Sequence, residues 1–378
     1  MEWFKLNLRH LRILALVHRT QSLSEAARQA HVTQPAASQA LFQLEAGLDC
    51  SFFERRPDGV TSTAFAESFA PRIETALEAL QSPNITMAQM RALIAFADEG
   101  SYLGASKVLG VSSPSLNRAI RDLTIVLGEP LLARRGRGMT LTAQGRTHTR
   151  QFRLARSELI AGLTELQNIK GKEVGRIAIG AMPLSRARVL PAAICRFRAR
   201  HPQVEIAVHE GSYAELIEPL RDSALDVIIG ALRPEATADL SQTLVFEDHP
   251  VILAGAHHPI LQSDAVSLPE LADYEWALPP QGTPLRKQCC AFFESEGLPP
   301  PSVPIESGSV LLIRELLRQS DLLTLLSKDQ VSVELEASWL KVVRTLPHTF
   351  VRRIGVTTRA GWRPTPLQTA FIDLLYDP

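Results

Sequence analysis

Apolar and polar positions follow the same order in two stretches near the start of the chain. Each stretch begins with apolar residues at helical spacing, passes through an alanine-rich segment and a short turn, and ends in a second amphipathic segment and two extended runs. Residues 11–63 align with residues 90–142 at a constant shift of 79 positions without a gap. A match of this length indicates a duplicated structural unit. Identical residues at equivalent positions include Arg12 and Arg91, Leu14 and Leu93, Ser22 and Ser101, Ala26 and Ala105, Val32 and Val111, Pro35 and Pro114, Leu44 and Leu123, and Gly59 and Gly138.

Each copy is expected to form three helices followed by a β-hairpin. In copy one, residues 24–30 form a short helix, residues 31–33 a tight turn, and residues 34–45 a third helix that tolerates Pro35 in its first turn. Two short strands around Gly59 follow. A short helix, a three-residue turn and a polar-faced helix are typical of a helix-turn-helix, whose second helix presents its early residues to base edges in the major groove.

The early residues of the third helices and the arginines of the hairpins are therefore candidate DNA contacts. A basic hairpin beside such a helix is suited to contact with phosphates. The base-edge candidates are Thr33, Gln34, Pro35, Ala36, Ser38 and Gln39 in copy one and Ser112, Ser113, Ser115, Asn117 and Arg118 in copy two. The phosphate candidates are Arg55, Arg56, Arg121, Arg134, Arg135 and Arg137.

A long linker helix is predicted from about residue 143 to residue 170. Phe152, Leu159 and Leu166 recur in it at seven-residue spacing, which is typical of a seam between two helices. The alternative is a helix that packs on its own domain, because two to three heptads are a short signal. Copy one has only a truncated counterpart, residues 64–80.

From residue 175 onward, short apolar runs alternate with helical patterns, which predicts an α/β domain with largely parallel sheets. Ligands of such sheets bind beyond the carboxyl ends of the strands, near helix N-termini. Three stretches that follow or precede predicted elements there offer hydroxyl or free backbone N–H groups, with ordinary helix capping as the alternative for each. The candidate effector-binding residues are Pro183, Ser185, Thr283, Ser307 and Ser309. The predicted strands are 176–180, 204–210, 226–230, 251–254, 276–278, 303–305, 322–326, 341–344 and 352–357.

The formal net charge of zero hides an asymmetry along the chain. Residues 1–172 contain 21 Lys and Arg against 15 Asp and Glu, whereas the remainder contains 19 against 25. A basic N-terminal part joined to an acidic C-terminal part indicates a nucleic-acid-binding module attached to another domain. The basic excess lies in copy two, because residues 83–172 hold 13 basic and 6 acidic residues while residues 1–82 hold 8 and 9.

Several function classes are not expected. The N-terminus lacks the apolar segment of a signal peptide, and no apolar run approaches the ~18 residues of a membrane span, so we expect a cytoplasmic protein without a membrane partner. His257 and His258 lack a nearby set of further metal ligands. Cys289 and Cys290 are interpreted as buried structural thiols, since adjacent cysteines bridge only with strain. No catalytic Ser, His and Asp arrangement is recognised, so no enzyme, metal or cofactor is expected.

Residues 22–38, together with residues 44–55, resemble the winged helix-turn-helix of the LysR-type transcriptional regulators. The resemblance covers nearly the whole chain and departs from the family pattern in the duplication, since the usual member carries one such unit. It implies a sequence-specific DNA-binding regulator whose linker helix forms the dimer and whose C-terminal part is a two-lobed effector domain like a type II periplasmic-binding protein. Residues 181–190 are most similar to the subgroup of sugar-related regulators named for a galactose-binding-protein operon.

The expected fold is therefore multidomain. It comprises two all-α winged helix-turn-helix domains, a long linker helix and a two-lobed α/β domain. Expected partners are double-stranded DNA, a small polar or anionic effector, RNA polymerase, and further copies of the chain in a homodimer or homotetramer formed through the linker helix. The expected domains are residues 1–82, residues 83–172 with the linker helix, and residues 173–378, with lobe one at about 175–246 and 349–376 and lobe two at about 249–345.

Two alternatives stay open. In the first, only one winged helix binds DNA and the other is a protein-contact module, which the lack of basic excess in copy one favours. In the second, the chain is a cytoplasmic small-molecule carrier or enzyme that kept the two-lobe fold, and the absence of a recognisable catalytic arrangement weighs against it.

Overall fold

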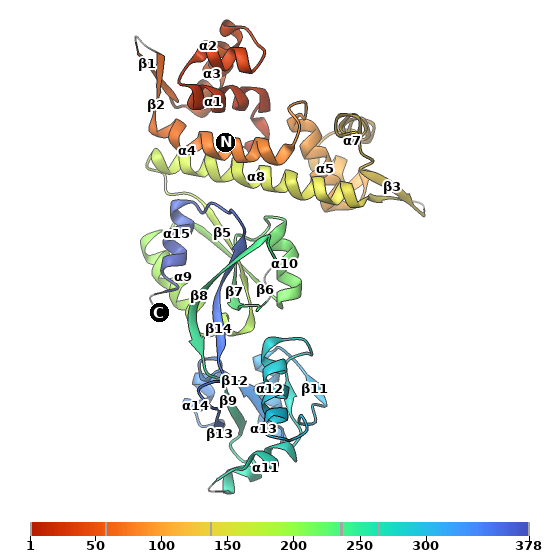
Figure 1. Ribbon diagram of the computed structural model, residues 1–378, viewed down its shortest axis with the longest axis vertical. Helices are drawn as coiled ribbons and strands as arrows, with labels where there is room; N and C mark the ends of the chain where they lie inside the picture. Colours follow the sequence, from red (N-terminus) through yellow and green to blue (C-terminus); the bar gives the residue numbers. More distant parts are fainter. Residues whose placement is uncertain (1, 57–58, 137, 235–236, 264, 377–378) are drawn as a thin grey trace. The chain divides into compact units, whose positions relative to one another are not determined.

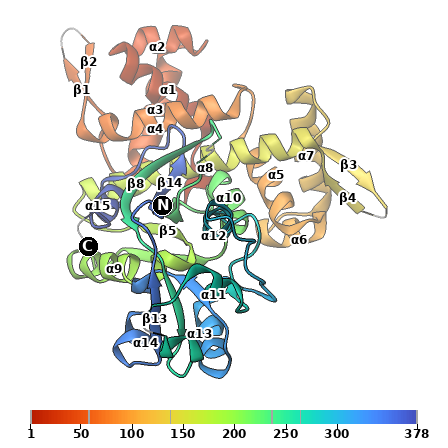
Figure 2. The ribbon, with the colours of Figure 1, turned by 60° about the horizontal axis from the view of Figure 1, so that its bottom comes forward.

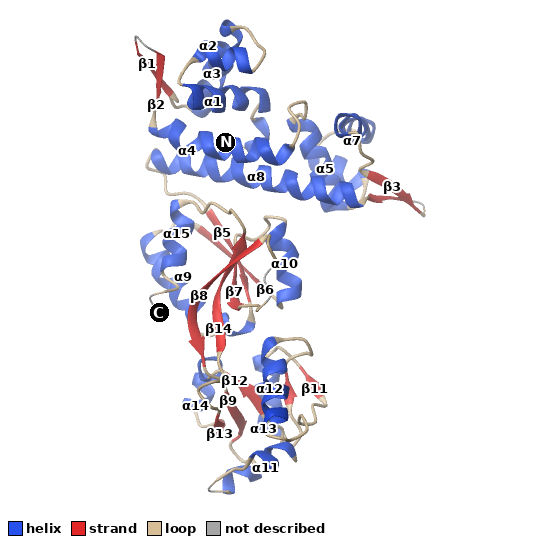
Figure 3. Cartoon of the chain, viewed as in Figure 1, coloured by secondary structure: helices blue, strands red, loops and turns tan. Residues whose placement is uncertain are grey.

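The computed structural model describes residues 2–56, 59–136, 138–234, 237–263 and 265–376. The chain divides into two units, Met1–Gly175 and Arg176–Pro378 (Figure 1). The described part of the first unit is helical apart from two short hairpins, whereas the second unit alternates helices and strands (Figure 3). None of the described helices is long and apolar enough to cross a membrane.

The duplication seen in the sequence is repeated element by element in the first unit. Helix α3 begins at Gln34 and α7 begins at Ser113, which is again a shift of 79 residues. Copy one contains η1 (Trp3–Lys5), α1 (Leu8–Thr20), α2 (Leu23–Gln29), α3 (Gln34–Leu48), β1 (Phe53–Arg56) and β2 (Gly59–Ser62). Copy two contains α5 (Met87–Glu99), α6 (Tyr102–Leu109), α7 (Ser113–Leu127), β3 (Leu132–Arg135) and β4 (Gly138–Leu141).

Local capping explains where the short helices begin. The Ser22 hydroxyl accepts a hydrogen bond from the backbone N–H of Glu25 at the start of α2, and Ser101 caps α6 in the equivalent way. Thr33 and Ser112 cap α3 and α7. A hydroxyl at the N-cap satisfies one of the backbone N–H groups that a helix leaves unpaired, so the turn between the paired helices is already encoded locally.

The predicted linker helix is paired with a helix of the same chain. Helix α8 (Ala143–Ile169) packs along α4 (Ala64–Leu80), and Figures 1 and 2 both show the two side by side. The two helices run antiparallel, because Ser68 bonds to Glu165 while Arg72, one turn later, bonds back to Glu158. A single apolar core includes both helices and parts of both copies.

This pairing corrects the expectation that the linker helix joins two chains through its heptad seam. Phe152 and Leu159 are fully buried within one chain, and Leu166 is 1% exposed. The heptad residues of α8 do form a helix–helix contact, but their partner is α4 of the same chain. The sequence showed only a truncated counterpart in copy one, and that counterpart is long enough to bury the seam.

The second unit contains a five-stranded sheet in the order β6-β5-β7-β14-β8. Strand β5 pairs parallel with β6 and β7, whereas β14 pairs antiparallel with β7 and β8. The strands are β5 (Arg176–Ala181), β6 (Glu205–Glu210), β7 (Val227–Ala231), β8 (Leu240–Asp248) and β14 (Arg352–Arg359). The helices that follow these strands are α9 (Val189–Arg200), α10 (Tyr213–Arg221) and α15 (Pro366–Asp373), with η2 (Pro183–Arg186) after β5.

The chain leaves this sheet through β8 and returns to it through β14. Between them lie a three-stranded sheet in the order β12-β9-β13 and a parallel pair of β10 and β11. Arg352 and Asp248 form a buried ion pair at this passage, with Nη2 and Oδ2 2.5 Å apart. The elements are β9 (Val251–Gly255), η3 (Pro259–Gln262), α11 (Leu268–Ala272), β10 (Ala277–Leu278), α12 (Pro284–Ser295), β11 (Ile305–Glu306), α13 (Val310–Gln319), β12 (Thr324–Leu326), η4 (Lys328–Val331), α14 (Ser332–Glu336) and β13 (Leu340–Thr345).

Two sequence expectations are corrected here. The five-stranded sheet is mixed and the three-stranded sheet is antiparallel, whereas largely parallel sheets were expected. In the five-stranded sheet, the outgoing strand β8 and the returning strand β14 lie side by side and therefore run in opposite directions. Strand β8 was not among the predicted strands. Its alternation of buried and exposed positions is carried by polar as well as apolar residues, from Leu240 to Asp248, so periodicity gives a weak signal there.

Candidate nucleic-acid interface and effector site

Helix α3 presents most of the predicted base contacts of copy one at the surface. Thr33, Gln34, Pro35, Ala36 and Gln39 are exposed, and Ser38 is half-buried. The opposite face of the helix is apolar and buried, with Ala37, Ala40, Leu41, Leu44 and Leu48 in the core. This burial fixes which face of α3 points outward. The Thr33 hydroxyl also accepts a hydrogen bond from Ala36 N–H at 3.4 Å, so it serves as the helix cap.

Helix α7 presents a more basic surface. Ser115, Asn117, Arg118 and Arg121 are exposed, and Arg118 lies 3.8 Å from Asp122 in a loose surface ion pair. Ser112 is also exposed, but its hydroxyl bonds to Ser115 at 2.8 Å.

Ser113 differs from the other base-edge candidates in copy two. It is half-buried, and its hydroxyl bonds to the largely buried Ser106 at 3.0 Å. The structure therefore gives Ser113 an internal partner, which connects α6 to α7.

The wings are the hairpins β1–β2 and β3–β4, and each carries arginines on its first strand. Arg55 and Arg56 on β1 and Arg134 and Arg135 on β3 are all exposed. Arg137 lies outside the described residues. The exposed guanidinium groups suit phosphate contact, because backbone phosphates are recognised by charge and without sequence preference.

The two copies differ at the positions where they are equivalent. Gln39 of α3 corresponds to Arg118 of α7, and Phe42, which is 64% exposed, corresponds to Arg121. Copy one therefore presents amide and apolar groups where copy two presents two guanidinium groups. Both surfaces are open to solvent in the structure.

Sequence reasoning missed the residues that fix the α4–α8 pairing. Arg72 is 2% exposed and bonds to Glu165 at 2.7 Å and Glu158 at 3.0 Å. Burial by itself lowers the pKa of the Arg72 guanidinium, but the hydrogen bond to Glu165 and the charges of both carboxylates outweigh burial and raise that pKa. A single arginine among the apolar residues of α4 was the available signal, because an unpaired buried charge is costly.

Two further contacts bring α8 against copy one. A Cβ atom at Gly162 would lie 2.4 Å from Cδ2 of Phe69, so only glycine permits the observed approach of the two helices. Lys170, just after α8, donates from Nζ to the carbonyl oxygen of Leu48 at 2.7 Å. Leu48 is the last residue of α3, so the residue directly after α8 contacts the end of the recognition helix of copy one.

The predicted effector residues lie at the start of helical segments in the second unit. Thr283 precedes α12 and Ser307 follows β11, and since β10 and β11 are parallel neighbours, both residues lie toward the same edge of this pair. Ser309 caps α13 by accepting from Leu312 N–H at 3.4 Å. The structure thus places Thr283, Ser307 and Ser309 toward one strand edge.

Pro183 and Ser185 lie in η2, which follows β5 of the five-stranded sheet. Ser185 is fully buried, and its hydroxyl donates to the carbonyl oxygen of Met182 at 2.8 Å. Thr283 makes a similar local bond, donating to the Pro280 carbonyl oxygen at 2.9 Å. In the structure these two hydroxyls are used in local turns, and Ser185 is the less accessible of the two.

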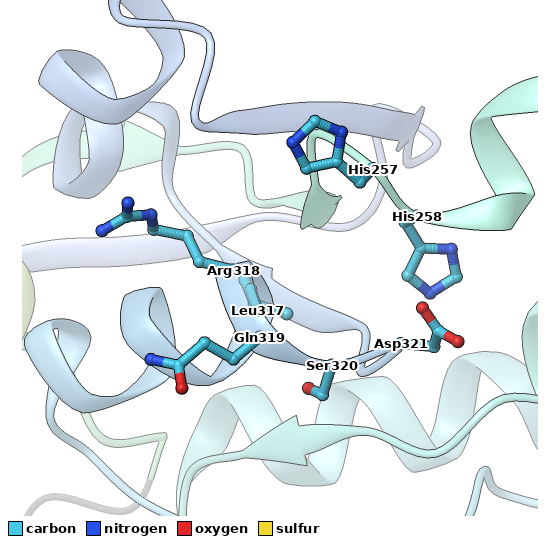
Figure 4. A pocket seen from close by; sticks show the side chains of 7 residues that line it. All are labelled: His257, His258, Leu317, Arg318, Gln319, Ser320 and Asp321. Carbon is cyan, nitrogen blue, oxygen red and sulfur yellow. The ribbon is translucent and has the colours of Figure 1, made fainter.

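A separate polar pocket lies next to the C-terminal end of β9. It is formed where the C-terminus of α13 meets the residues after β9 (Figure 4). His258 is 3% exposed, its Nδ1 accepts from Ile260 N–H at 3.1 Å, and burial lowers its pKa. None of the five predicted effector residues lines this pocket. The lining residues are His257, His258, Leu317, Arg318, Gln319, Ser320 and Asp321.

Cys289 is buried, as the sequence indicated. Burial raises the pKa of the Cys289 thiol to about 12, so its reactive thiolate is scarce at neutral pH. Cys290 is only half-buried, which corrects the expectation of a second buried thiol, and the four cysteines are free thiols.

Comparison with protein families accounts for both units. The family described as bacterial regulatory helix-turn-helix protein, lysR family, matches residues 8–67 and again residues 87–146. The LysR substrate binding domain matches residues 170–377, which is more than half of the chain. The chain belongs to the LysR family of transcriptional regulators. It is accordingly a DNA-binding regulator with an effector-binding domain, and its relatives are regulators rather than enzymes.

Individual LysR relatives differ in how much of this chain they match. The transcriptional regulator GalR of Pseudomonas putida is 30% identical over 381 residues, covering 97% of this chain and 96% of its own. The regulator PcaQ of Agrobacterium fabrum is 25% identical over 282 residues, covering 74% of this chain and 91% of its own. About a quarter of this chain thus has no aligned counterpart in PcaQ, whereas GalR matches along nearly its full length.

Two solved LysR structures share the fold at low identity. A full-length OxyR variant from Pseudomonas aeruginosa superposes with a TM-score of 0.57 at 22% identity, covering 78% of this chain and 97% of that protein. Full-length CbnR in complex with its target DNA gives a TM-score of 0.55 at 18% identity, covering 76% of this chain and 98% of that protein. At these identities, the likeness concerns the fold alone.

Proposed function

We propose that this LysR-type regulator binds specific DNA sequences through two winged helix-turn-helix domains and responds to a small polar or anionic effector bound by a two-lobed domain. The proposed domains are residues 1–82, residues 83–172 and residues 173–378. The regulator would act in the cytoplasm together with RNA polymerase, and copies of the chain would associate through surfaces other than the α4–α8 seam.

The observation that carries the DNA-binding part is the outward-facing surface of each copy. Both α3 and α7 bury one apolar face and expose their early polar residues, which is how a recognition helix reaches base edges. The wings add exposed arginines on β1 and β3. The rival in which copy one is only a protein-contact module is supported by the scarcity of exposed basic side chains on α3.

The test separates charge from base recognition. A duplex enriched from a random library by the full-length chain serves as the specific site, and a scrambled duplex as the non-specific one. Arg135→Ala should weaken binding to both duplexes and reduce the salt slope by about 0.9, the loss of one phosphate contact. Gln34→Ala should cost about 1–3 kcal/mol on the specific duplex alone, if its amide holds a bidentate base contact.

The matched control is Arg200→Ala, an exposed arginine at the end of α9 in the second unit. It removes the same charge without touching the wing or the recognition helices. Wild-type affinity of the Gln34→Ala variant for the specific duplex would support the rival with a single DNA-binding copy. If Arg135→Ala and Arg200→Ala weakened DNA binding equally, the loss would be explained by the lower net charge and not by a contact of the wing.

The effector part rests on the hydroxyls at the edge of β10 and β11. Ser307 and Ser309 precede the ten-residue helix α13, where backbone N–H groups and the helix dipole favour negative charge. Thr283 approaches the same edge from the start of α12. This combination supports a carboxylate, phosphate or sugar-like hydroxyl ligand rather than an apolar one.

A panel of sugars, sugar acids and other small carboxylates tests this assignment by the increase in unfolding temperature of the full-length chain. A stabilising compound should lose its effect on Ser307→Ala and Ser309→Ala and keep it on Ser320→Ala, which changes the polar pocket at the far end of α13. The opposite pattern, with loss only at Ser320, would move the effector site to that pocket.

A further inference from the structure

The two recognition helices of one chain carry different side chains at equivalent positions. The early part of α3 is rich in amides, while α7 has an amide and two exposed guanidinium groups on the corresponding face. An arginine side chain pairs best with the O6 and N7 acceptors of guanine, an amide side chain pairs best with adenine, and an apolar side chain contacts the thymine methyl group. The equivalent pairs are Gln34 and Ser113, Ala36 and Ser115, Ser38 and Asn117, Gln39 and Arg118, and Phe42 and Arg121.

The α4–α8 pair holds these two unlike helices in one body. Arg72 of α4 is locked between two glutamates of α8, and Gly162 lets the helices approach closely at Phe69. Arg91 of α5 also lies over the ring of Phe4, with the guanidinium carbon 4.3 Å from the ring centroid. The two copies therefore share one core and several cross-contacts, and they are not tethered by a flexible linker.

The pairing also sets how far apart the two copies lie. Wing two ends just before Ala143, at the N-terminus of α8, while Ser68, close to the end of wing one, bonds to Glu165. Glu165 lies 22 positions after Ala143, so the bases of the two wings are separated by about 33 Å along α8. Figures 1 and 2 show the two wings at opposite ends of the α4–α8 pair. Paired recognition units on DNA commonly contact half-sites about 34–36 Å apart, one turn of the duplex.

We propose that a single chain binds one DNA duplex through two unlike half-sites, one turn apart, and therefore recognises a non-palindromic sequence. Copy two selects the half-site that contains guanine through Arg118, and copy one selects an adenine- and thymine-containing half-site through Gln39 and the exposed ring of Phe42. Palindromic sites arise when two identical subunits face each other, but here the paired units are two different sequences in one chain. The proposal rests on the proposed DNA-binding function and adds the form of the target.

Selection of binding sequences from a random duplex library by the full-length chain tests this directly. The wild-type chain should enrich a motif with two unlike blocks centred about one helical turn apart. Arg118→Ala should remove the guanine preference in one block only, and Gln39→Ala should relax the other block only. Each variant should bind the wild-type motif about ten-fold more weakly, the loss expected for one good base contact.

Both substituted residues are exposed, so each variant should unfold at the wild-type temperature. A motif of two identical inverted blocks that both change with one variant would overturn the proposal. A single block that responds to Arg118→Ala and not to Gln39→Ala would also overturn it and leave DNA binding intact. No enrichment of any duplex would instead contradict the proposed function itself.

Discussion

Gly162 shows how one missing side chain sets the spacing of two helices. It lies in α8 opposite the buried ring of Phe69 in α4, and a Cβ atom there would come within 2.6 Å of two ring carbons. Glycine lowers helix propensity by about 1 kcal/mol relative to alanine, so its presence in the middle of α8 is explained by packing.

Gly162→Leu should lower the free energy of unfolding of the first unit by about 2 kcal/mol, because overpacking costs more than the gain in helix propensity. Chemical denaturation followed by circular dichroism measures this loss. Ile160→Leu is the control, since Ile160 is 43% exposed on the same helix and should change stability by less than about 0.5 kcal/mol. A Gly162→Leu variant as stable as the control would show that the two helices are not closely packed in solution.

Arg72 is the second residue that shapes this contact. Buried ion pairs add little net stability, because the cost of removing water from the charges offsets their attraction. In this pairing, sliding of α4 along α8 would leave Glu158 or Glu165 without its partner, which disfavours other registers. Arg72 therefore fixes the register in which the two copies are held.

Among the elements, α4 and α8 depart most from the sequence expectation. Both follow a wing and begin directly after a threonine, Thr63 and Thr142, and both carry a fully buried alanine at equivalent positions, Ala76 and Ala155. The two helices are thus equivalent elements that pack on each other within one chain. The heptad spacing correctly predicted that α8 packs against another helix, but it did not predict which helix.

The recognition helices follow the sequence more closely. The apolar positions of α3 and α7 predict the buried face, and the remaining positions are then exposed. Ser38 and Ser113 are only half-buried, and the Ser113 hydroxyl bonds to Ser106 in the preceding helix. A sequence pattern does not distinguish a serine that faces DNA from one that joins two helices.

At the scale of the whole molecule, the two units have separate cores and opposite charge. The apolar core of copy one extends through α4 and α8 into copy two, and the cores of the second unit involve only residues after Arg176. Residues 1–175 contain 21 Lys and Arg against 16 Asp and Glu, a net charge of +5, and residues 176–378 contain 19 against 24, a net charge of −5. The DNA-binding unit is therefore the basic one.

Leu159→Asp distinguishes an intrachain seam from an interchain one. Since Leu159 is fully buried against the chain's own core, an aspartate should destabilise the first unit by more than about 4 kcal/mol, through lost packing and an unpaired buried charge. Differential scanning calorimetry should show the transition of the first unit at a much lower temperature, with that of the second unit unchanged. A folded variant of normal thermal stability but lower molar mass in light scattering would show instead that the seam joins two chains.

Sequence patterns alone were enough to predict the repeated unit, the order of its elements, the first residues of α2 and α3 to within one position, and most of the exposed polar positions. These properties follow from short-range physics, namely apolar periodicity, hydroxyl caps at Ser22 and Thr33, and turn residues. The sequence also indicated the α/β class of the second unit, but it missed β8 and the antiparallel course of β14, because strand direction depends on how distant segments meet.

Which surfaces contact each other became known from the fold alone. Phe152, Leu159 and Leu166 have the same spacing whether their partner is another chain or an earlier helix of the same one. The choice of α4 depends on contacts between residues far apart in the chain, such as Ser68 with Glu165, 97 positions apart, and Arg72 with Glu158, 86 positions apart. Local sequence patterns do not predict such contacts. For the same reason, the sequence grouped Ser185 with Thr283 and Ser307, whereas the fold buries Ser185 in a local turn after β5.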